Sequence, residues 1–229
     1  MQILTIQIIV LILLASAVGL WGRYFPYPSP VVRRWLPARF RWPEQQIRDW
    51  LSNRRFQRAF LRYFYRDPER FPPEGTSVIA PADGIVTGTD VRDGTRYLVI
   101  ALSFWDMHVQ RSPASGVVVS VDDSGDTFMD GEGQQFAFLK GKHCPVQKRI
   151  VLETGSGRLA VRLITSLAAR RIEAWVKPGD EVSRGQRIGR ILLGSTVVLE
   201  LPATAPLLVP TGVRVRAGET PVANAVTAS

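Results

Sequence analysis

The dipeptide Gly194-Ser195 stands out because it interrupts an otherwise apolar run from Ile191 to Leu199. Glycine reaches backbone angles that other residues avoid, so it can hold a strained peptide bond. The hydroxyl of the serine that follows can then attack the carbonyl of Gly194. The local pattern alone leaves two interpretations open: self-cleavage between positions 194 and 195, and a β-bulge with a buried serine.

A second Gly-Ser pair, Gly155-Ser156, provides a contrast within the same chain. It lies between two strand-like runs in the segment from Thr154 to Arg158, a placement that is typical of a hairpin turn. We therefore predict a turn at Gly155-Ser156 and chemistry only at Gly194-Ser195.

The elements that must position Gly194-Ser195 are predicted to be strands. Between about residues 78 and 215, short β-branched runs alternate with Gly, Asp and Pro turns, and no stretch has a long helical period. Such spacing predicts a mostly antiparallel β domain, either a barrel or a sandwich. The clearest strand candidates are Gly84–Val86, Tyr97–Ile100, Gly116–Val119, Ile150–Leu152 and Leu159–Leu163.

Two turns in this region, at Ala80–Val86 and Lys177–Gly189, resemble the half-motifs of biotinyl and lipoyl domains and other barrel-sandwich hybrids. The predicted fold class is therefore a mostly β, barrel-sandwich-hybrid-like domain. This resemblance concerns turn geometry, so it bears on the fold and not on chemistry. A carrier domain would need a modifiable lysine flanked by methionine, and none of the three methionines flanks a lysine.

The N-terminal segment from Ile3 to Trp21 is almost wholly apolar. Roughly 20 helical residues cross a hydrocarbon core of about 30 Å, so we predict a transmembrane helix. The alternative is a cleaved signal peptide with Ala15-Ser16-Ala17 as its cleavage motif, but no Lys or Arg precedes the run, which exceeds the usual length of about 7–15 residues. Arginines follow the span and none precedes it, which places the rest of the chain on the cytoplasmic side.

The net charge of +9 is concentrated after this span, where arginines from Arg23 to Arg70 are interleaved with Trp, Tyr and Phe. Such a segment favours the headgroups of anionic lipids; nucleic acid would attract it too, but the adjoining span makes lipid the better partner. The predicted organisation is an anchor with a basic exit segment (1–42), an interfacial helix (43–70), a β domain cleaved at 194/195 (71–215) and a flexible tail (216–229).

Six motifs follow one another along the chain: Phe64–Arg70 with Pro72, Pro81–Gly84, Ser103–Pro113 with Gly116, Ala169–Ile172, Gly179-Asp180 with Gly185, and Gly194–Thr196. In this order and spacing, they resemble the phosphatidylserine decarboxylases, particularly the short bacterial and archaeal form, from about Tyr63 to Pro202. Gly194-Ser195 falls where the self-cleavage site of that family belongs.

This resemblance implies a membrane decarboxylase that makes a covalent pyruvoyl group from Ser195. Attack of the Ser195 hydroxyl on Gly194 turns the peptide into an ester, whose loss gives dehydroalanine and then the pyruvoyl group. The pyruvoyl ketone forms a Schiff base with the substrate amine and accepts electrons as carbon dioxide leaves, so that phosphatidylserine becomes phosphatidylethanolamine. The implied partners are an anionic phospholipid membrane, a serine phospholipid and the large (1–194) and small (195–229) chains of one precursor. Neither nucleic acid nor a metal is implied, and a homo-oligomer is left open.

The resemblance also assigns roles to two further residues. His108 is the expected proton handler, because imidazole titrates near neutral pH; the alternative is a hydrogen-bonded histidine of the core. Asp83 is expected to orient the histidine or activate the serine, as the third member of a hydrolase triad does, and its alternative is an Asp-Gly turn residue. His143 receives no role.

The chain departs from the family where some members have a second histidine, because Arg111 stands at that position. A triad of Asp, that histidine and Ser is therefore not expected, and His108 is left as the candidate base for both steps. Thr196-Val197-Val198 also replaces the Arg-Val-Asp that often follows the cleavage site, which leaves the headgroup specificity open. The alternatives to a decarboxylase are a non-catalytic, membrane-tethered barrel-sandwich binding module and a self-cleaving structural protein.

Overall fold

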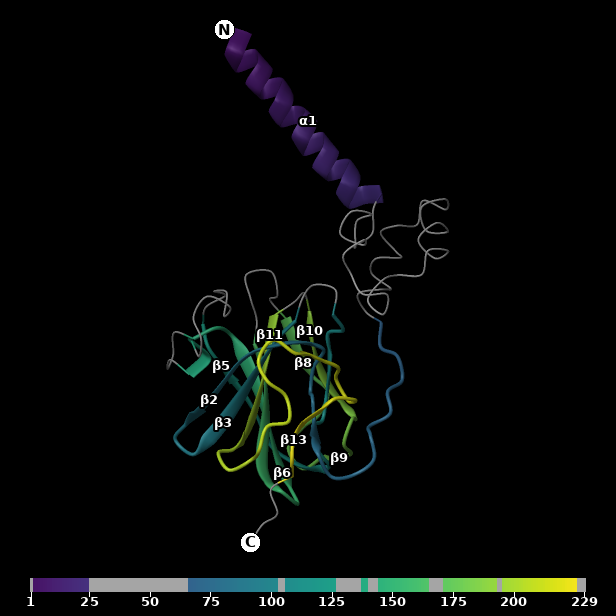
Figure 1. The fold of residues 1–229 in the computed structure, drawn as a ribbon, viewed down its shortest axis with the longest axis vertical. Coiled ribbons are helices and arrows are strands. Elements are labelled where there is room, and N and C mark those ends of the chain that lie inside the picture. The colour runs from purple at the N-terminus through teal and green to yellow at the C-terminus, as the bar shows by residue number, and fades with distance from the viewer. Residues whose placement is uncertain are drawn as a thin grey trace. The chain divides into compact units, whose positions relative to one another are not determined.

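The computed structural model describes residues 2–24, 66–102, 106–126, 137–139, 144–164, 171–192 and 195–225. The chain divides into two compact units, residues 1–66 and residues 67–229. The first contains the helix α1 (Gln2–Tyr24), and the second contains every described strand (Figure 1).

Helix α1 forms from the apolar N-terminal run, which contains no proline. A helix forms here as predicted, but its prediction as a transmembrane helix is not confirmed, because no helix within the described residues is both long and apolar enough to span a membrane. Most of the interfacial helix predicted over 43–70 lies outside the described residues, and residues 66–70 form no helix.

The second unit contains three sheets, and every pairing between its described strands is antiparallel. The eight-stranded sheet has the order β12 (Arg214–Val215), β2 (Gly84–Arg92), β3 (Thr95–Leu102), β11 (Ser195–Pro202), β7 (Gly157–Ile164), β6 (Gln147–Thr154), β5 (Gly116–Ser124) and β9 (Glu181–Val182). The three-stranded sheet consists of β4 (Val109–Arg111), β10 (Arg187–Leu192) and β8 (Arg171–Ala174). The two-stranded sheet pairs β1 (Val78–Ile79) with β13 (Pro221–Ala223). A short 3₁₀ helix, η3 (Ala137–Leu139), is also present.

The five strand candidates named from the sequence all lie within observed strands, so the mostly antiparallel β prediction is confirmed. The turn predicted at Gly155-Ser156 is also confirmed, because β6 and β7 pair up to Thr154 and Gly157. Gly179 likewise occupies a turn before β9, with a φ of 91°. Barrel-sandwich-hybrid architecture itself stays a prediction.

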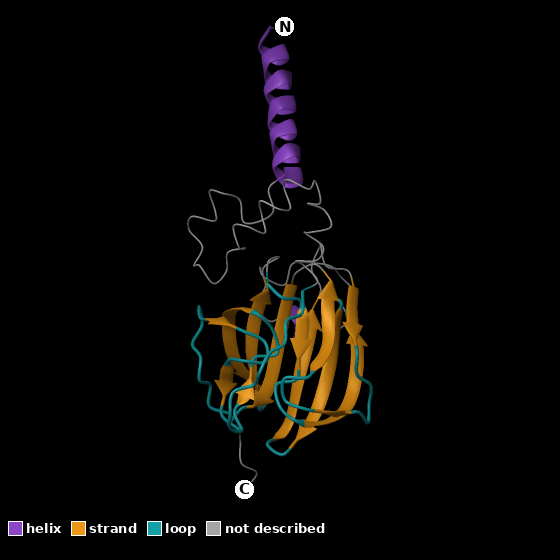
Figure 2. Ribbon diagram, turned by 90° about the vertical axis from the view of Figure 1, so that its right-hand side faces the viewer, coloured by secondary structure: helices purple, strands orange, loops and turns teal. Residues whose placement is uncertain are grey.

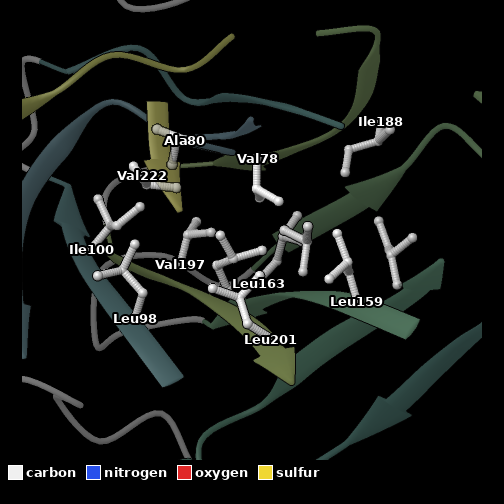
Figure 3. Close-up of a cluster of buried hydrophobic side chains, with 14 of the residues drawn as sticks. Val78, Ala80, Leu98, Ile100, Leu159, Leu163, Ile188, Val197, Leu201 and Val222 are labelled. Atoms are coloured by element: carbon white, nitrogen blue, oxygen red, sulfur yellow. The ribbon is translucent and has the colours of Figure 1, made fainter. Parts of the chain in front are cut away.

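One hydrophobic core joins the sheets, and the strands curl around it (Figure 2). Ile100, Val197 and Leu163 come from three adjacent strands of the large sheet, and Val222 reaches them from β13 (Figure 3). Each of these four side chains is fully buried. Successive residues of a strand point to opposite faces of a sheet, so a second, smaller cluster forms from Tyr97, Phe138, Ile164 and Val198.

The sequence prediction for the C-terminal tail needs correction. The tail predicted as flexible over 216–229 contains β13, and Ala217, Val222 and Ala223 are buried. Its small apolar residues were misleading because they lack strand-like alternation, yet they pair with β1 and close the core. The apolar run from Ile191 to Leu199 is divided between two sheets, since β10 ends at Leu192 and β11 begins at Ser195.

Candidate active site

Ser195 is the first residue of β11, where it pairs with Leu102 at the end of β3. The preceding strand, β10, ends at Leu192 and belongs to the three-stranded sheet. The chain therefore passes from one sheet to the other between residues 192 and 195. The predicted cleavage bond, between Gly194 and Ser195, falls on this connection between sheets. Gly194 itself lies outside the described residues.

His108 comes from a second connection between the same two sheets, which joins the end of β3 at Leu102 to the start of β4 at Val109. Because β3 pairs with β11 and β4 pairs with β10, both connections join neighbouring pairs of strands. The carbonyl oxygen of His108 accepts a hydrogen bond from the amide of Ile191 at 3.1 Å. The topology thus brings a buried histidine, 1% exposed, beside the strand end that leads to Gly194-Ser195.

Asp83 lies in the turn before β2 and is held by an arginine. Arg70 donates from Nη1 to Oδ1 at 2.8 Å and from Nη2 to Oδ2 at 2.9 Å. The amide of Ala217 donates to Oδ1 at 2.8 Å. Arg70 Nη2 also contacts Sδ of Met107, the neighbour of His108, at 3.0 Å. Asp83 is therefore connected to the His108 segment through Arg70.

A second buried carboxylate lies two residues before His108. Asp106 is 8% exposed, and its Oδ1 accepts a hydrogen bond from Nη1 of Arg214 in β12. Each buried acid near His108 thus has an arginine partner, which is how proteins hold buried charges. Within the described parts of the chain, no cluster of His, Cys, Asp or Glu could hold a metal ion.

Gln110 is a polar residue that the sequence did not single out. It is fully buried, and neither Nε2 nor Oε1 has a hydrogen-bond partner among the residues that the structure describes. Gln110 lies in β4, two residues after His108. A buried amide without partners costs about 1–3 kcal/mol, so this residue is a candidate for contact with a bound group.

Comparison with known proteins identifies the family of this chain. A family model described as "Phosphatidylserine decarboxylase" matches residues 57–223, which is most of the chain. This chain belongs to the phosphatidylserine decarboxylase family.

Two relatives illustrate the range of phosphatidylserine decarboxylase family members that the chain resembles. The phosphatidylserine decarboxylase proenzyme of Desulfotalea psychrophila is 38% identical over 171 residues, covering 71% of this chain and 78% of the relative. The putative archaetidylserine decarboxylase proenzyme of Archaeoglobus fulgidus is 40% identical over 161 residues, covering 70% and 76%.

Arg111, which replaces the second histidine of some phosphatidylserine decarboxylases, forms part of the scaffold. It donates to the carbonyl oxygen of Gly185 at 3.0 Å, to Oδ1 of Asp67 at 2.9 Å and to the carbonyl oxygen of Pro68 at 3.0 Å. It is 4% exposed and fastens residues 67–73, the leading segment, to the turn before β10. No sequence signal distinguished Arg111 as an anchor, because its partners are 44 and 74 residues away.

Arg187 of β10 holds the same leading segment by its acids. Its guanidinium binds Asp67, and Nη2 lies 2.8 Å from Oε1 of Glu69. The hydrogen bond from Arg187 lowers the pKa of the Glu69 carboxyl, and the charge of Arg187 adds to the effect. The leading segment is therefore attached to the β domain by charges that both arginines supply.

Proposed function

We propose that this chain cleaves itself between Gly194 and Ser195 and then decarboxylates phosphatidylserine to phosphatidylethanolamine. The single observation that carries the proposal is the position of Ser195 at the connection between two sheets, directly after the strand β10, whose Ile191 amide donates to the carbonyl oxygen of His108. The names of the relatives, which are decarboxylase proenzymes, support both halves of the proposal.

In the first reaction, the Ser195 hydroxyl oxygen attacks the carbonyl carbon of Gly194, and its proton passes to the His108 imidazole. The C–N bond of the peptide breaks as the C–O bond of an ester forms, and the freed amino group takes the proton. Loss of the Cα proton of residue 195 then expels the Gly194 carboxylate and leaves dehydroalanine. Water converts this residue to a pyruvoyl group and releases ammonia, so the large chain ends at Gly194.

The described residues around position 195 fit such a group. β11 continues into the core from Ser195, and its next two residues, Thr196 and Val197, are buried. The buried amide of Gln110 has no hydrogen-bond partner in the structure and can donate to a carbonyl or carboxylate oxygen. A pyruvoyl group supplies an electron sink for decarboxylation.

In the second reaction, the residues of this chain bind the substrate and move a proton. Gln110 Nε2 donates to the serine carboxylate, and burial near His108 removes the water that would otherwise solvate it. After carbon dioxide leaves, His108, protonated by solvent since the first reaction, donates a proton to the substrate Cα, and hydrolysis by water then releases the product amine. In this scheme, Asp83 does not contact the substrate; it holds Arg70, which contacts Met107 beside His108.

A denaturing gel with intact-mass measurement tests self-cleavage. We expect two chains that break between residues 194 and 195, with Ser195→Ala leaving one chain of 25.5 kDa and Ser156→Ala, in the β6–β7 turn, cleaving normally. A single uncut wild-type chain would overturn the proposal and favour a binding module.

Carbon dioxide release from vesicles that contain phosphatidylserine tests the decarboxylation. The names of the relatives give two candidate substrates, phosphatidylserine and archaetidylserine. A matched vesicle that carries an ether-linked archaeal serine lipid instead of phosphatidylserine distinguishes between them. We expect release from phosphatidylserine; cleavage without release from either lipid would indicate a self-cleaving structural protein.

We further propose that α1 attaches the protein to the membrane that contains its substrate. Leu11, Ile12, Leu13 and Leu14 are each more than half exposed, and such apolar surface gains free energy from contact with lipid. The arginines that follow the helix in the sequence favour the cytoplasmic side. In a flotation assay with vesicles, Leu11→Lys/Leu13→Lys should leave the protein unbound, and flotation equal to wild type would contradict this attachment.

A further inference from the structure

We propose that Arg70 is a positioning residue that fixes the small chain against the segment carrying His108. The inference rests on the proposed function, because only cleavage at 194/195 divides its partners between two chains. Asp83 and Met107 belong to residues 1–194, and Ala217 belongs to residues 195–229. Arg70 contacts all three.

The guanidinium of Arg70 is fully engaged inside the protein. Its side chain is 1% exposed, and Nη1 and Nη2 form the paired hydrogen bonds to Asp83 at 2.8 and 2.9 Å. Nη1 donates in addition to the carbonyl oxygen of Ala217 at 2.9 Å, and Nη2 contacts Met107 Sδ at 3.0 Å. Three chain segments that are far apart in sequence therefore meet at one cation.

Ala217 is bound through both of its backbone groups. Its carbonyl oxygen accepts from Arg70, and its amide donates to Oδ1 of Asp83 at 2.8 Å. A paired donor and acceptor fix the position and the direction of the peptide, which a single contact would not do. The Arg70–Asp83 pair therefore binds the backbone of residue 217, and these hydrogen bonds do not involve its side chain.

The next residue reinforces this arrangement. Gly218 has a φ of 76°, and a Cβ at that position would lie 2.8 Å from Cδ of Arg111 and 3.8 Å from Cβ of Arg70. Both arginine side chains therefore pack on a backbone that only glycine can supply without strain. The hydrogen bonds to Ala217 and the packing of the two arginine side chains on Gly218 therefore fix the same stretch of the small chain.

A buried ion pair is weak evidence for stability, because desolvation cancels much of its attraction. The guanidinium of Arg70 is planar and forms paired hydrogen bonds to a carboxylate, which the ammonium group of a lysine cannot do. We therefore infer that the Arg70–Asp83 pair has a positioning role: it sets where the small chain and the Met107-His108 segment lie relative to each other. Small displacements in an active site cost up to about 100-fold in rate.

The test compares Arg70→Lys with the double variant Arg70→Met/Asp83→Leu, which removes both buried charges and so avoids leaving an unpaired one. Arg158→Lys, in an exposed ion pair with Glu153, is the matched control. For each folded protein we measure the self-cleavage rate, kcat and KM for phosphatidylserine vesicles, and the melting temperature.

We expect both Arg70 variants to lose about 10- to 100-fold in kcat with KM within about twofold, at melting temperatures near that of wild type. Arg70→Lys should recover part of the loss seen in the double variant, because it restores one charge and one contact. A purely structural pair would lower the melting temperature and leave kcat of the folded protein unchanged, and that result would overturn the inference.

The wild-type protein separates this inference from the proposed function. If unsubstituted protein fails to cleave or to release carbon dioxide, the proposed function fails, and the Arg70 inference fails with it. If wild type is active and the folded Arg70 variants match it, only the inference fails.

Discussion

Gly84 occupies a backbone position that excludes every other residue. Its φ is 152°, and a Cβ would lie 2.3 Å from the carbonyl oxygen of Ala101 on the paired strand β3. We expect Gly84→Ala to lower the free energy of unfolding by about 1–3 kcal/mol, measured by urea titration. The matched control is Gly88→Ala in the same strand, where nothing lies within 4 Å of a new Cβ. Equal effects of the two substitutions would contradict this explanation.

Gln110 provides a second prediction, in which stability and activity change in opposite directions. Because its buried amide has no hydrogen-bond partner, Gln110→Leu should raise the free energy of unfolding by about 1 kcal/mol while slowing decarboxylation. Gln147→Leu is the control, since that equally buried amide donates to Phe138 and accepts from Arg162. It should destabilise the protein, and a loss of stability in Gln110→Leu would show that we have missed a structural role.

The sequence predicts single residues well where a local rule fixes them. The Asp-Gly turn before β2 and the turn at Gly155-Ser156 both form, because each depends on neighbours in the chain. Gln110 and Arg70 could not be found this way, because burial and partners depend on segments up to 147 residues distant. The placement of His108 beside β10 likewise needed the strand pairing.

The leading segment, residues 67–73, gives a prediction about pH. The Arg187 hydrogen bond lowers the pKa of Glu69 below its ordinary value of 4.5 in the folded protein. A lowered carboxyl pKa stabilises the folded state above the unfolded pKa, and this stability is lost as pH falls through the folded pKa. Glu69→Gln should therefore lower the melting temperature at pH 7, with a difference from wild type that shrinks as pH falls below 4.5 and vanishes below the lowered pKa of the folded protein.

Melting curves between pH 7 and pH 3 measure this difference. Glu74→Gln, which removes another exposed acid from the following turn, controls for the change in net charge. A difference for Glu69→Gln that persisted unchanged at pH 3 would mean that the side chain acts by packing and not by its charge.

At the scale of elements, strands with β-branched runs were predictable and short mixed strands were not. β3 and β7 contain the apolar runs Tyr97–Leu102 and Leu159–Val161, whereas β8 and β10 are short and combine apolar residues with arginines. One of these arginines, Arg190, is held by tertiary contacts with Glu173 and the ring of Trp175. Periodicity alone therefore left out the three-stranded sheet, and with it the reason that Gly194-Ser195 falls between sheets.

At the scale of the whole molecule, cleavage at 194/195 would produce a small chain that is built into the large one. All three of its strands pair with strands of residues 1–194: β11 with β3 and β7, β12 with β2, and β13 with β1. Because β11 has a neighbour on both sides, its removal would open the centre of the eight-stranded sheet. The two chains should therefore remain together after the covalent bond is lost.

Glu200 of β11 makes this prediction measurable. It is 4% exposed and accepts from Arg149 Nη2 at 2.7 Å and from Arg162 Nε at 2.8 Å, both on strands of the large chain. Glu200→Gln leaves two partly buried cations without their anion, which costs on the order of 2 kcal/mol. In cleaved protein, the urea concentration that releases the small chain in size-exclusion chromatography should fall by roughly 1 M. Glu219→Gln, whose partner Arg216 lies in the same small chain, should release at the wild-type concentration, because its ion pair crosses no boundary between chains.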